Sequence, residues 1–219
     1  MTSSRTARTT TRRSPAICLA GLLVVLAAAA VVGHPSAAPG RSASDAPAAA
    51  APPGVLPRAE GAAVGEADGV LPGGTTVSDD RLPGVAGLDP ALLRALRRAA
   101  ADAADAGVAL HVTSGWRSRE YQEQLLREAV AEYGSEEEAA RWVATADTSA
   151  HVSGDAVDVG PADAMAWLSG HGADHGLCRV YGNEPWHYEL RPEAVEHGCP
   201  RVYADPTQDP RTQRSGRSR

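Results

Sequence analysis

The stretch Ser149-Ala150-His151-Val152-Ser153-Gly154-Asp155-Ala156-Val157-Asp158 decides how the rest of the chain is organised. It places a histidine and a carboxylate seven positions apart, and a second fragment, Glu184-Pro185-Trp186-His187, supplies another histidine. Two His and one Asp are the usual ligand set of a catalytic zinc site, with the fourth position left to water. We therefore predict that His151, Asp158 and His187 bind one Zn²⁺ ion.

The residues around Asp158 predict a short strand. Residues 155–159 alternate so that Asp158 faces away from the neighbouring valines. His151 falls on the loop before this strand, and Gly154 allows that loop to turn sharply.

A second strand is expected at residues 186–190, with His187 and Glu189 on one face. Asp158 and His187 would point the same way if the two strands were adjacent. Glu184 would face away from His187 in a continuous strand, so the strand must begin after it, in a turn. From that turn Glu184 could take a proton from a water activated by the metal.

Three further stretches predict helices. Asp89-Pro90 predicts the start of a helix, and apolar residues then recur at helical spacing until Gly107. Ser118 is expected to cap a helix that runs to residue 133, and residues 161–171 predict another. A sheet that carries the site, with helices beside it, is an α+β arrangement.

These motifs resemble those of a known family. Ser149-x-His151-x-x-Gly154-x-Ala156-x-Asp158, followed by Glu184-x-x-His187, is similar to the signature of the zinc D-alanyl-D-alanine carboxypeptidases, in particular the VanY-like enzymes of bacterial cell walls. The stretch Ser114-Gly115-Trp116-Arg117-Ser118, with Gln122, is similar to the third motif of that family, which usually has Tyr where this chain has Trp116. The resemblance covers about residues 82–203.

The resemblance implies an α+β fold, in which a small antiparallel sheet carries the zinc site and helices pack on one side. It implies a peptidase that removes the terminal D-Ala from peptidoglycan stem peptides ending in D-Ala-D-Ala, using metal-activated water. Glu184 would be the base, and Arg117 would stabilise the oxyanion. Gln122 and Ser149 would bind the substrate.

Each of these residues also has a simpler interpretation. Arg117 could form a carboxylate pair on the surface, and Glu184 a salt bridge with a nearby arginine. Gln122 lies on the apolar stripe of its helix, where a buried amide could bond to the backbone instead of the substrate. Ser149 could simply belong to a loop turn.

Three other functions stay open at this stage. A non-catalytic peptidoglycan-binding module or a cell-wall endopeptidase could use the same scaffold. Two His and one carboxylate are also the ligands of non-haem iron oxygenases. The presence of Glu184 and Arg117 favours a hydrolase over a binding module, and a base beside the metal argues against iron.

The charge of the chain disfavours a nucleic-acid partner. All 21 basic residues are arginines, and four of them precede residue 40, where there is no acidic residue. The remaining 17 arginines face 27 acidic residues, which gives a net charge of −10 beyond that segment. A protein that binds nucleic acid would need a basic face.

Composition divides the chain into four parts. Residues 1–38 are interpreted as a signal peptide or an uncleaved membrane anchor, because arginines precede a 17-residue apolar run at residues 16–32. Both alternatives place the rest outside the cytoplasm, in the extracellular space or at the cell wall. We expect an Ala/Pro/Gly-rich disordered linker at residues 39–82, the zinc carboxypeptidase domain at residues 83–204, and a disordered tail at residues 205–219.

Two cysteines lie on either side of the second histidine motif, Cys178 before it and Cys199 after it. In an exported protein, two cysteines in one domain suggest a disulfide, although two buried thiols are the alternative. The bond would hold the strand that carries His187.

Overall fold

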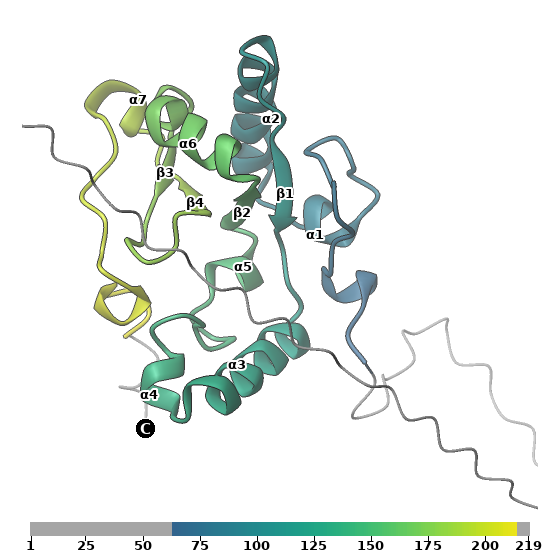
Figure 1. Cartoon of the computed structure of the whole chain (residues 1–219), viewed down its shortest axis with the longest axis vertical. Helices are drawn as coiled ribbons and strands as arrows, with labels where there is room; N and C mark the ends of the chain where they lie inside the picture. The colour runs from purple at the N-terminus through teal and green to yellow at the C-terminus, as the bar shows by residue number, and fades with distance from the viewer. Residues whose placement is uncertain (1–62, 214–219) are drawn as a thin grey trace, which may run out of the picture. The chain divides into compact units, whose positions relative to one another are not determined.

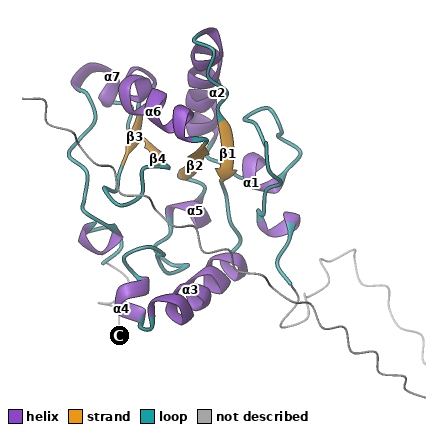
Figure 2. Cartoon of the chain, in the orientation of Figure 1, coloured by secondary structure: helices purple, strands orange, loops and turns teal. Residues whose placement is uncertain are grey.

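A computed structural model describes residues 63–213, which form helices and a small sheet (Figures 1 and 2). The strands are β1 (His111–Ser114), β2 (Ala156–Gly160), β3 (Leu177–Arg179) and β4 (His187–Leu190). The α-helices are α1 (Pro83–Ala86), α2 (Pro90–Asp105), α3 (Arg119–Tyr133), α4 (Glu136–Ala139), α5 (Ala150–Ser153), α6 (Ala162–His171) and α7 (Ala194–His197). Three 3₁₀ turns are η1 (Glu66–Asp68), η2 (Gly172–His175) and η3 (Pro206–Gln208).

The four strands form one antiparallel sheet in the order β1-β2-β4-β3. The two central strands, β2 and β4, are those expected to carry metal ligands. Their register pairs Asp158 with His187 directly. The predicted fold class, a small antiparallel sheet with helices beside it, is therefore confirmed.

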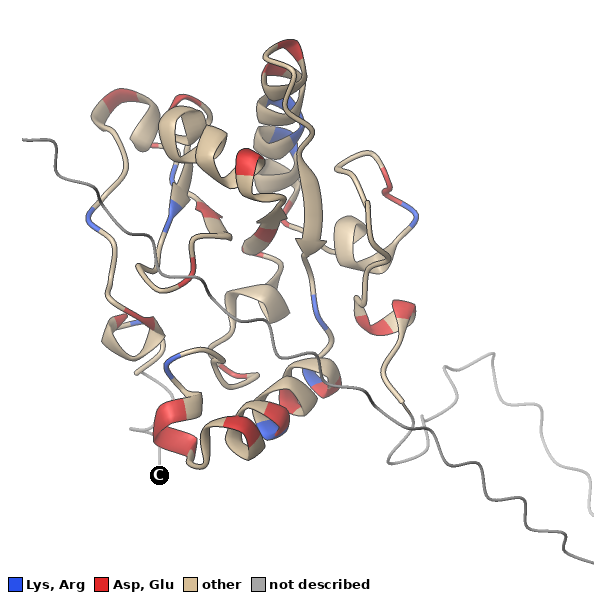
Figure 3. Cartoon of the chain, viewed as in Figure 1, with Lys and Arg blue, Asp and Glu red and all other residues tan. Residues whose placement is uncertain are grey.

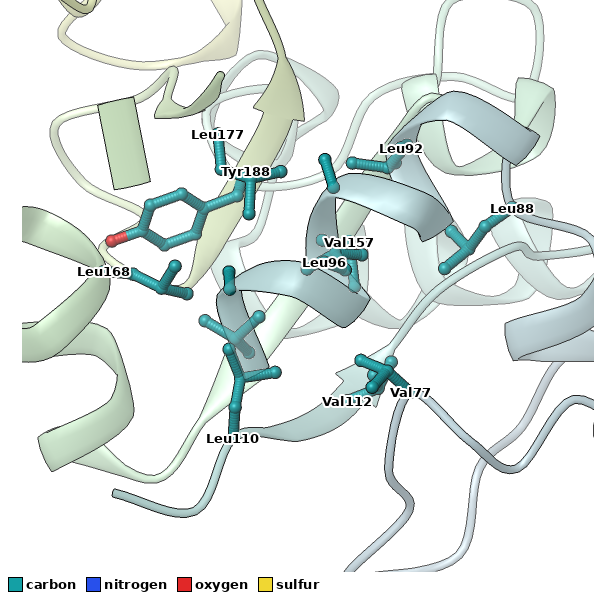
Figure 4. Packing of buried hydrophobic residues seen from close by; sticks show 13 residues of the cluster. Val77, Leu88, Leu92, Leu96, Leu110, Val112, Val157, Leu168, Leu177 and Tyr188 are labelled. Atoms are coloured by element: carbon teal, nitrogen blue, oxygen red, sulfur yellow. The ribbon is translucent and has the colours of Figure 1, made fainter. Parts of the chain in front are cut away.

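Alternation along the central strands separates a core face from a site face. Val157, Val159 and Tyr188 pack into the hydrophobic core with Leu92 and Leu96 of α2 (Figure 4). α6 also contacts the sheet, so α2 and α6 form the predicted helical layer. The opposite face of the same strands carries Asp158, His187 and Glu189, because successive side chains of a strand point to opposite faces.

The predicted helix starts are confirmed by their capping bonds. The Asp89 side chain accepts hydrogen bonds from the backbone N–H groups of Ala91 and Leu92, at 2.8 and 3.1 Å. The Ser118 hydroxyl accepts from the N–H of Tyr121 at 3.0 Å. Each cap pairs N–H groups that have no partner within the helix.

Figure 3 shows that acidic positions gather on α3 and α4, outside the helical layer that covers the core face.

The predicted disordered linker, residues 39–82, is wrong for residues 63–82. Val77 is buried in the core, and Arg97 of α2 donates to its carbonyl oxygen at 3.1 Å. The Ser118 backbone N–H donates to the carbonyl oxygen of Asp68 at 2.8 Å. The buried Val77 side chain and hydrogen bonds to two backbone carbonyl oxygens therefore tie this Gly/Pro-rich segment to the domain.

The predicted disordered tail, residues 205–219, is wrong for residues 205–213. Asp205 caps η3 by accepting from the Thr207 N–H at 3.0 Å, and Asp209 is completely buried. The described domain therefore extends beyond the predicted limits of 83 and 204 at both ends.

The disulfide between Cys178 and Cys199 is present, as predicted. The predicted signal peptide or anchor, residues 1–38, lies outside the described residues, as do residues 39–62 and 214–219. Within residues 63–213, no helix combines the length and the apolar character that a bilayer crossing requires.

Candidate metal centre and active-site cleft

Two strands and one short helix bring the three predicted ligands together. Asp158 and His187 come from paired positions of β2 and β4. His151 lies in α5, one helical turn, where a loop was expected. Gly154 ends this turn with φ +81°, and a Cβ atom there would lie 2.3 Å from the carbonyl oxygen of Gly87. Only glycine fits this turn, which leads the chain from His151 directly into β2.

The three side chains form a nearly equilateral triangle of ligand atoms. His151 Nε2 lies 3.2 Å from His187 Nδ1, and Asp158 Oδ1 lies 3.4 and 3.3 Å from these two nitrogens. All three residues are buried. With zinc–ligand bonds of about 2.0–2.1 Å, tetrahedral coordination places two ligand atoms roughly 3.3–3.4 Å apart. The residues therefore fit zinc in spacing as well as in chemical type.

An orphaned oxygen supports the same fit. Asp158 Oδ1 is buried and has no well-aligned hydrogen-bond partner among the described residues. A buried polar atom of this kind is costly unless something binds it. A cation in the triangle would satisfy it.

Each histidine is held through its other ring nitrogen. His151 Nδ1 lies 2.8 Å from the Gly115 carbonyl oxygen, which can only accept, so this nitrogen carries the proton. His187 Nε2 lies 3.4 Å from Glu189 Oε1. These contacts leave His151 Nε2 and His187 Nδ1 facing Asp158, in the arrangement that metal-binding histidines show.

The surroundings also set the charges of the ligands. Burial lowers the pKa of His151, and Arg117 adds to the effect. Burial alone would raise the pKa of Asp158, but His151, His187 and Arg117 hold it well below its usual value. Burial opposes the charged form of His187, yet the nearby carboxylates of Asp158 and Glu189 raise its pKa to about 9. Asp158 is therefore a carboxylate, and metal binding at His187 would release a proton.

Glu184 lies beside the triangle, in the turn before β4 where the sequence predicted it. Its Oε2 lies 3.7 Å from His187 Nδ1. Its Oε1 is buried and has no hydrogen-bond partner among the described residues. Burial raises the pKa of Glu184 to about 7, although His187 and Arg117 lower it. A carboxyl group with a pKa near the working pH is suited to move protons in both directions.

Arg117 lies partly buried in the wall of the cleft and is not part of a surface pair. Its Nη2 donates to Asp158 Oδ2 at 2.9 Å, and its Nε donates to the Ser114 hydroxyl at 2.8 Å. Its Nη1 donates to Gln122 Oε1 at 3.1 Å. Three side chains thus fix the guanidinium plane against the metal triangle.

The amide group of Gln122 is bound by other groups of the protein. Its side chain is almost completely buried, with its Oε1 bound to Arg117 and its Nε2 donating to the Ala144 carbonyl oxygen at 2.9 Å. These contacts match the buried, backbone-bonded alternative, and a substrate contact of Gln122, which also lines the cleft, stays a prediction. Gln122 orients Arg117 from α3.

Ser149 lines the cleft beside His151. Among the described residues its side chain makes no capping hydrogen bond at the start of α5, so its hydroxyl can bind a substrate. The cleft has a volume of about 200 Å³ and is also lined by Trp142 and Trp186. A larger cavity of about 580 Å³ adjoins it, but the described residues lining that cavity include no histidine or aspartate.

A family model described as VanY, D-alanyl-D-alanine carboxypeptidase, matches residues 86–193. These residues form a VanY-family domain. The match contains all three ligands, Glu184 and Arg117, so the resemblance inferred from the motifs is confirmed.

A curated relative of the VanY-family domain is a D-alanyl-D-alanine carboxypeptidase of Enterococcus faecalis (strain ATCC 700802 / V583). It is 37% identical over 114 residues, which cover 40% of this chain and 42% of the relative. The chain therefore matches less than half the length of that protein.

Two solved structures are also similar to the chain. One is a mutant of the vancomycin resistance D,D-pentapeptidase VanY from a VanB-type resistance cassette, in complex with Zn(II). The other is VanYB in complex with D-alanine-D-alanine. Both are 29% identical with a TM-score of 0.47, and each alignment covers 51% of this chain and 75% or 74% of the other chain. The family assignment rests on the sequence match and not on these alignments.

Sequence reasoning assigned no role to two residues behind the metal triangle of the VanY-family domain. Glu189 contacts His187, and Arg211 contacts Glu189. Glu189 could have been found, because it shares a strand face with His187. No motif or spacing near Arg211 indicated a contact with Glu189, since Arg211 lies in a polar segment beyond the matched residues.

Proposed function

We propose that this chain is a zinc-dependent D-alanyl-D-alanine carboxypeptidase that removes the terminal D-Ala from peptidoglycan stem peptides. The observation that carries the proposal is the triangle of His151, Asp158 and His187, with ligand atoms 3.2–3.4 Å apart. Glu184 lies beside the triangle, with Oε2 3.7 Å from His187 Nδ1, and its Oε1 has no hydrogen-bond partner among the described residues. The VanY family match supports the reaction class.

The metal and Glu184 divide the chemistry between them. Zn²⁺, when bound, supplies a Lewis acid that polarises the peptide carbonyl and lowers the pKa of a water. Glu184 Oε1 takes the proton from the attacking water and delivers it to the leaving amine. Burial, which raises the pKa of Glu184 in the metal-free site, favours a group that can first accept and then donate a proton.

Arg117 has two guanidinium N–H groups that its contacts with Ser114, Gln122 and Asp158 do not use. A guanidinium group has five N–H donors. Single bonds to Ser114, Gln122 and Asp158 use one each, so one N–H remains on Nη1 and one on Nη2. These donors can stabilise the oxyanion that forms at the scissile carbonyl, where a charge-assisted donor is strongest.

The cleft suits a small peptide end. Its volume of about 200 Å³ is below the roughly 300 Å³ at which pockets for drug-sized ligands begin. Ser149 lines the cleft, and its hydroxyl would hydrogen-bond the last residues of the peptide. A short, D-Ala-sized terminus is therefore the substrate part that we place here.

We also propose that the domain works outside the cytoplasm. The Cys178–Cys199 disulfide supports this location, because structural disulfides persist in oxidising compartments. Export by residues 1–38, as a cleaved signal or as a membrane anchor, would bring the domain to its peptidoglycan substrate.

The test is incubation of the zinc-loaded protein with a stem pentapeptide ending in D-Ala-D-Ala, followed by mass analysis. We expect loss of a single alanine. A C-terminal amide and a peptide with a terminal L-Ala should be poor substrates, because the site is proposed to bind the free carboxylate and the D-configuration. Equal cleavage of all three would indicate an endopeptidase.

Metal analysis completes the test. Stoichiometric zinc in active protein is the expected result. Iron in place of zinc would point to oxygenase chemistry. Zinc without any peptide cleavage would favour a non-catalytic wall-binding module.

A further inference from the structure

A buried carboxylate connects the metal ligand His187 to the C-terminal part of the chain. Glu189 is almost completely buried, and its Oε1 lies 3.4 Å from His187 Nε2. Arg211 donates to both of its oxygens, from Nη1 to Oε2 at 2.6 Å and from Nη2 to Oε1 at 3.1 Å. Arg191 Nη2 also donates to Oε2 at 2.7 Å. A two-point contact of this kind fixes the plane of the carboxylate.

Arg211 is itself held in place by Asp209. The Asp209 carboxylate is completely buried and accepts from Arg211 Nε and Nη2 and from the Arg211 backbone N–H. It also accepts from the Tyr181 hydroxyl at 3.1 Å. The Tyr181 ring lies 5.1 Å from the His187 ring. Asp209 is therefore also connected to the metal ligand His187 through Tyr181.

The segment that carries Arg211 is compact. The Thr212 hydroxyl donates to the carbonyl oxygen of Pro206 at 2.7 Å, and Asp205 pairs with Arg141 at 3.3 Å. In Figure 1 the chain runs from α7 toward α4 and reaches this yellow segment near α4. The segment lies wholly outside residues 86–193, which match the family model.

We propose that residues 205–213 are a positioning segment for the metal centre. Arg211, oriented by Asp209, holds the Glu189 carboxylate, and Glu189 fixes the His187 ring with Nδ1 directed at the other two ligands. The inference rests on the metal site of the proposed function and adds a part of the chain that the family match does not include. Arg211 and Glu189 are positioning residues, since they act through His187.

The physical reason is the freedom of an imidazole ring. Without an acceptor at Nε2, the ring can take the other tautomer or turn its Nδ1 away from the triangle. Partners that hold a ligating histidine typically affect metal affinity by about 10–100-fold when they are removed. Arg191 also binds Glu189, but only through Oε2, so it cannot replace the two-point contact of Arg211.

The test compares zinc affinities of the full chain by competition with a chromophoric chelator. Arg211→Met should weaken zinc binding by about 10-fold or more. The matched control is Arg97→Met, which removes another arginine that ties an outer segment to the domain, through Val77 and Asp80. Arg97 belongs to α2, on the core side of the sheet, so its replacement should lower stability without changing zinc affinity.

Two further readouts separate positioning from stability. The visible spectrum of the cobalt-substituted protein should change in Arg211→Met and stay unchanged in Arg97→Met. Arg211→Lys, which keeps the charge but not the fork, should have an intermediate zinc affinity. If Arg211→Met does not fold, Asp209→Asn provides the same comparison.

Wild-type zinc affinity in the folded Arg211 or Asp209 variants would overturn the inference. The assay needs no peptide substrate, so its result is independent of the proposed reaction. The proposed function would be refuted if the wild-type protein bound zinc but cleaved no peptide. The inference would still stand if the Arg211 variants of that protein bound zinc more weakly.

Discussion

Replacement of Arg117 by methionine should destabilise the domain strongly, because it dismantles a buried polar network. The guanidinium group is bonded to Asp158 at 2.9 Å, to Ser114 at 2.8 Å and to Gln122 at 3.1 Å. The side chains of Arg117 and Asp158 are only 13% and 10% exposed. Methionine is close to arginine in the length of its apolar stem, so the change removes mainly the polar contacts.

The expected loss follows from these contacts. Breaking a buried ion pair by removing one partner typically costs about 3–5 kcal/mol, because a charge stays buried without compensation. The Gln122 oxygen would also lose its donor, and an unsatisfied buried acceptor by itself costs roughly 1–3 kcal/mol. We expect a total of at least about 4 kcal/mol, which lowers the unfolding midpoint of a domain of this size by about 10 °C or more.

The assay is thermal or urea unfolding with a chelator present, so that bound metal does not compensate for Asp158. The matched control is Arg119→Met, two positions along the chain. The Arg119–Asp147 pair has side chains that are 53% and 65% exposed, so its loss should change the midpoint little. If Arg117→Met destabilises the protein no more than Arg119→Met does, the reasoning about the buried network is wrong.

Three further predictions concern the metal centre and the disulfide. Glu184→Gln should retain stoichiometric zinc but lose about 10²–10⁴-fold in turnover, the usual contribution of general acid–base catalysis; near-normal turnover would move the base elsewhere. His151→Ala should abolish zinc binding, as measured by metal analysis after dialysis, and retained zinc would remove His151 from the ligand set. The Cys178→Ser, Cys199→Ser double variant should lower the unfolding free energy by about 3 kcal/mol in denaturant titrations, because the bond closes a loop with a sequence separation of 21; unchanged stability would contradict this estimate.

The metal triangle was predictable because its determinants are local. Alternation along β2 assigns Asp158 and Val157 to opposite faces, whatever the rest of the chain does. Gly154 marks the turn that brings His151 to the start of the strand, and its φ of +81° bears this out. Residue types then indicate the chemistry, since two His and one Asp suit zinc. The sequence therefore indicated the three candidate ligands and the strand faces that carry them, whereas the pairing of β2 with β4 that brings them together is a feature of the tertiary structure.

The extent of the domain was not predictable in the same way. Residues 63–82 and 205–213 are rich in Gly, Pro or polar residues, and such compositions are typical of disorder. Composition is an average, whereas anchoring depends on single side chains, such as Val77 in the core and the completely buried Asp209. Where those side chains find space is decided by the rest of the fold.

The network around the metal centre was decided only by the tertiary structure. Gln122 bonds to Ala144, 22 positions away, and Arg211 bonds to Glu189, also 22 positions away. Neither pair falls at a helix or strand spacing, so no periodicity could have indicated it. Their partners are set by how the elements close over one another, because a buried charge or amide must take the partner that the surrounding chain places within reach.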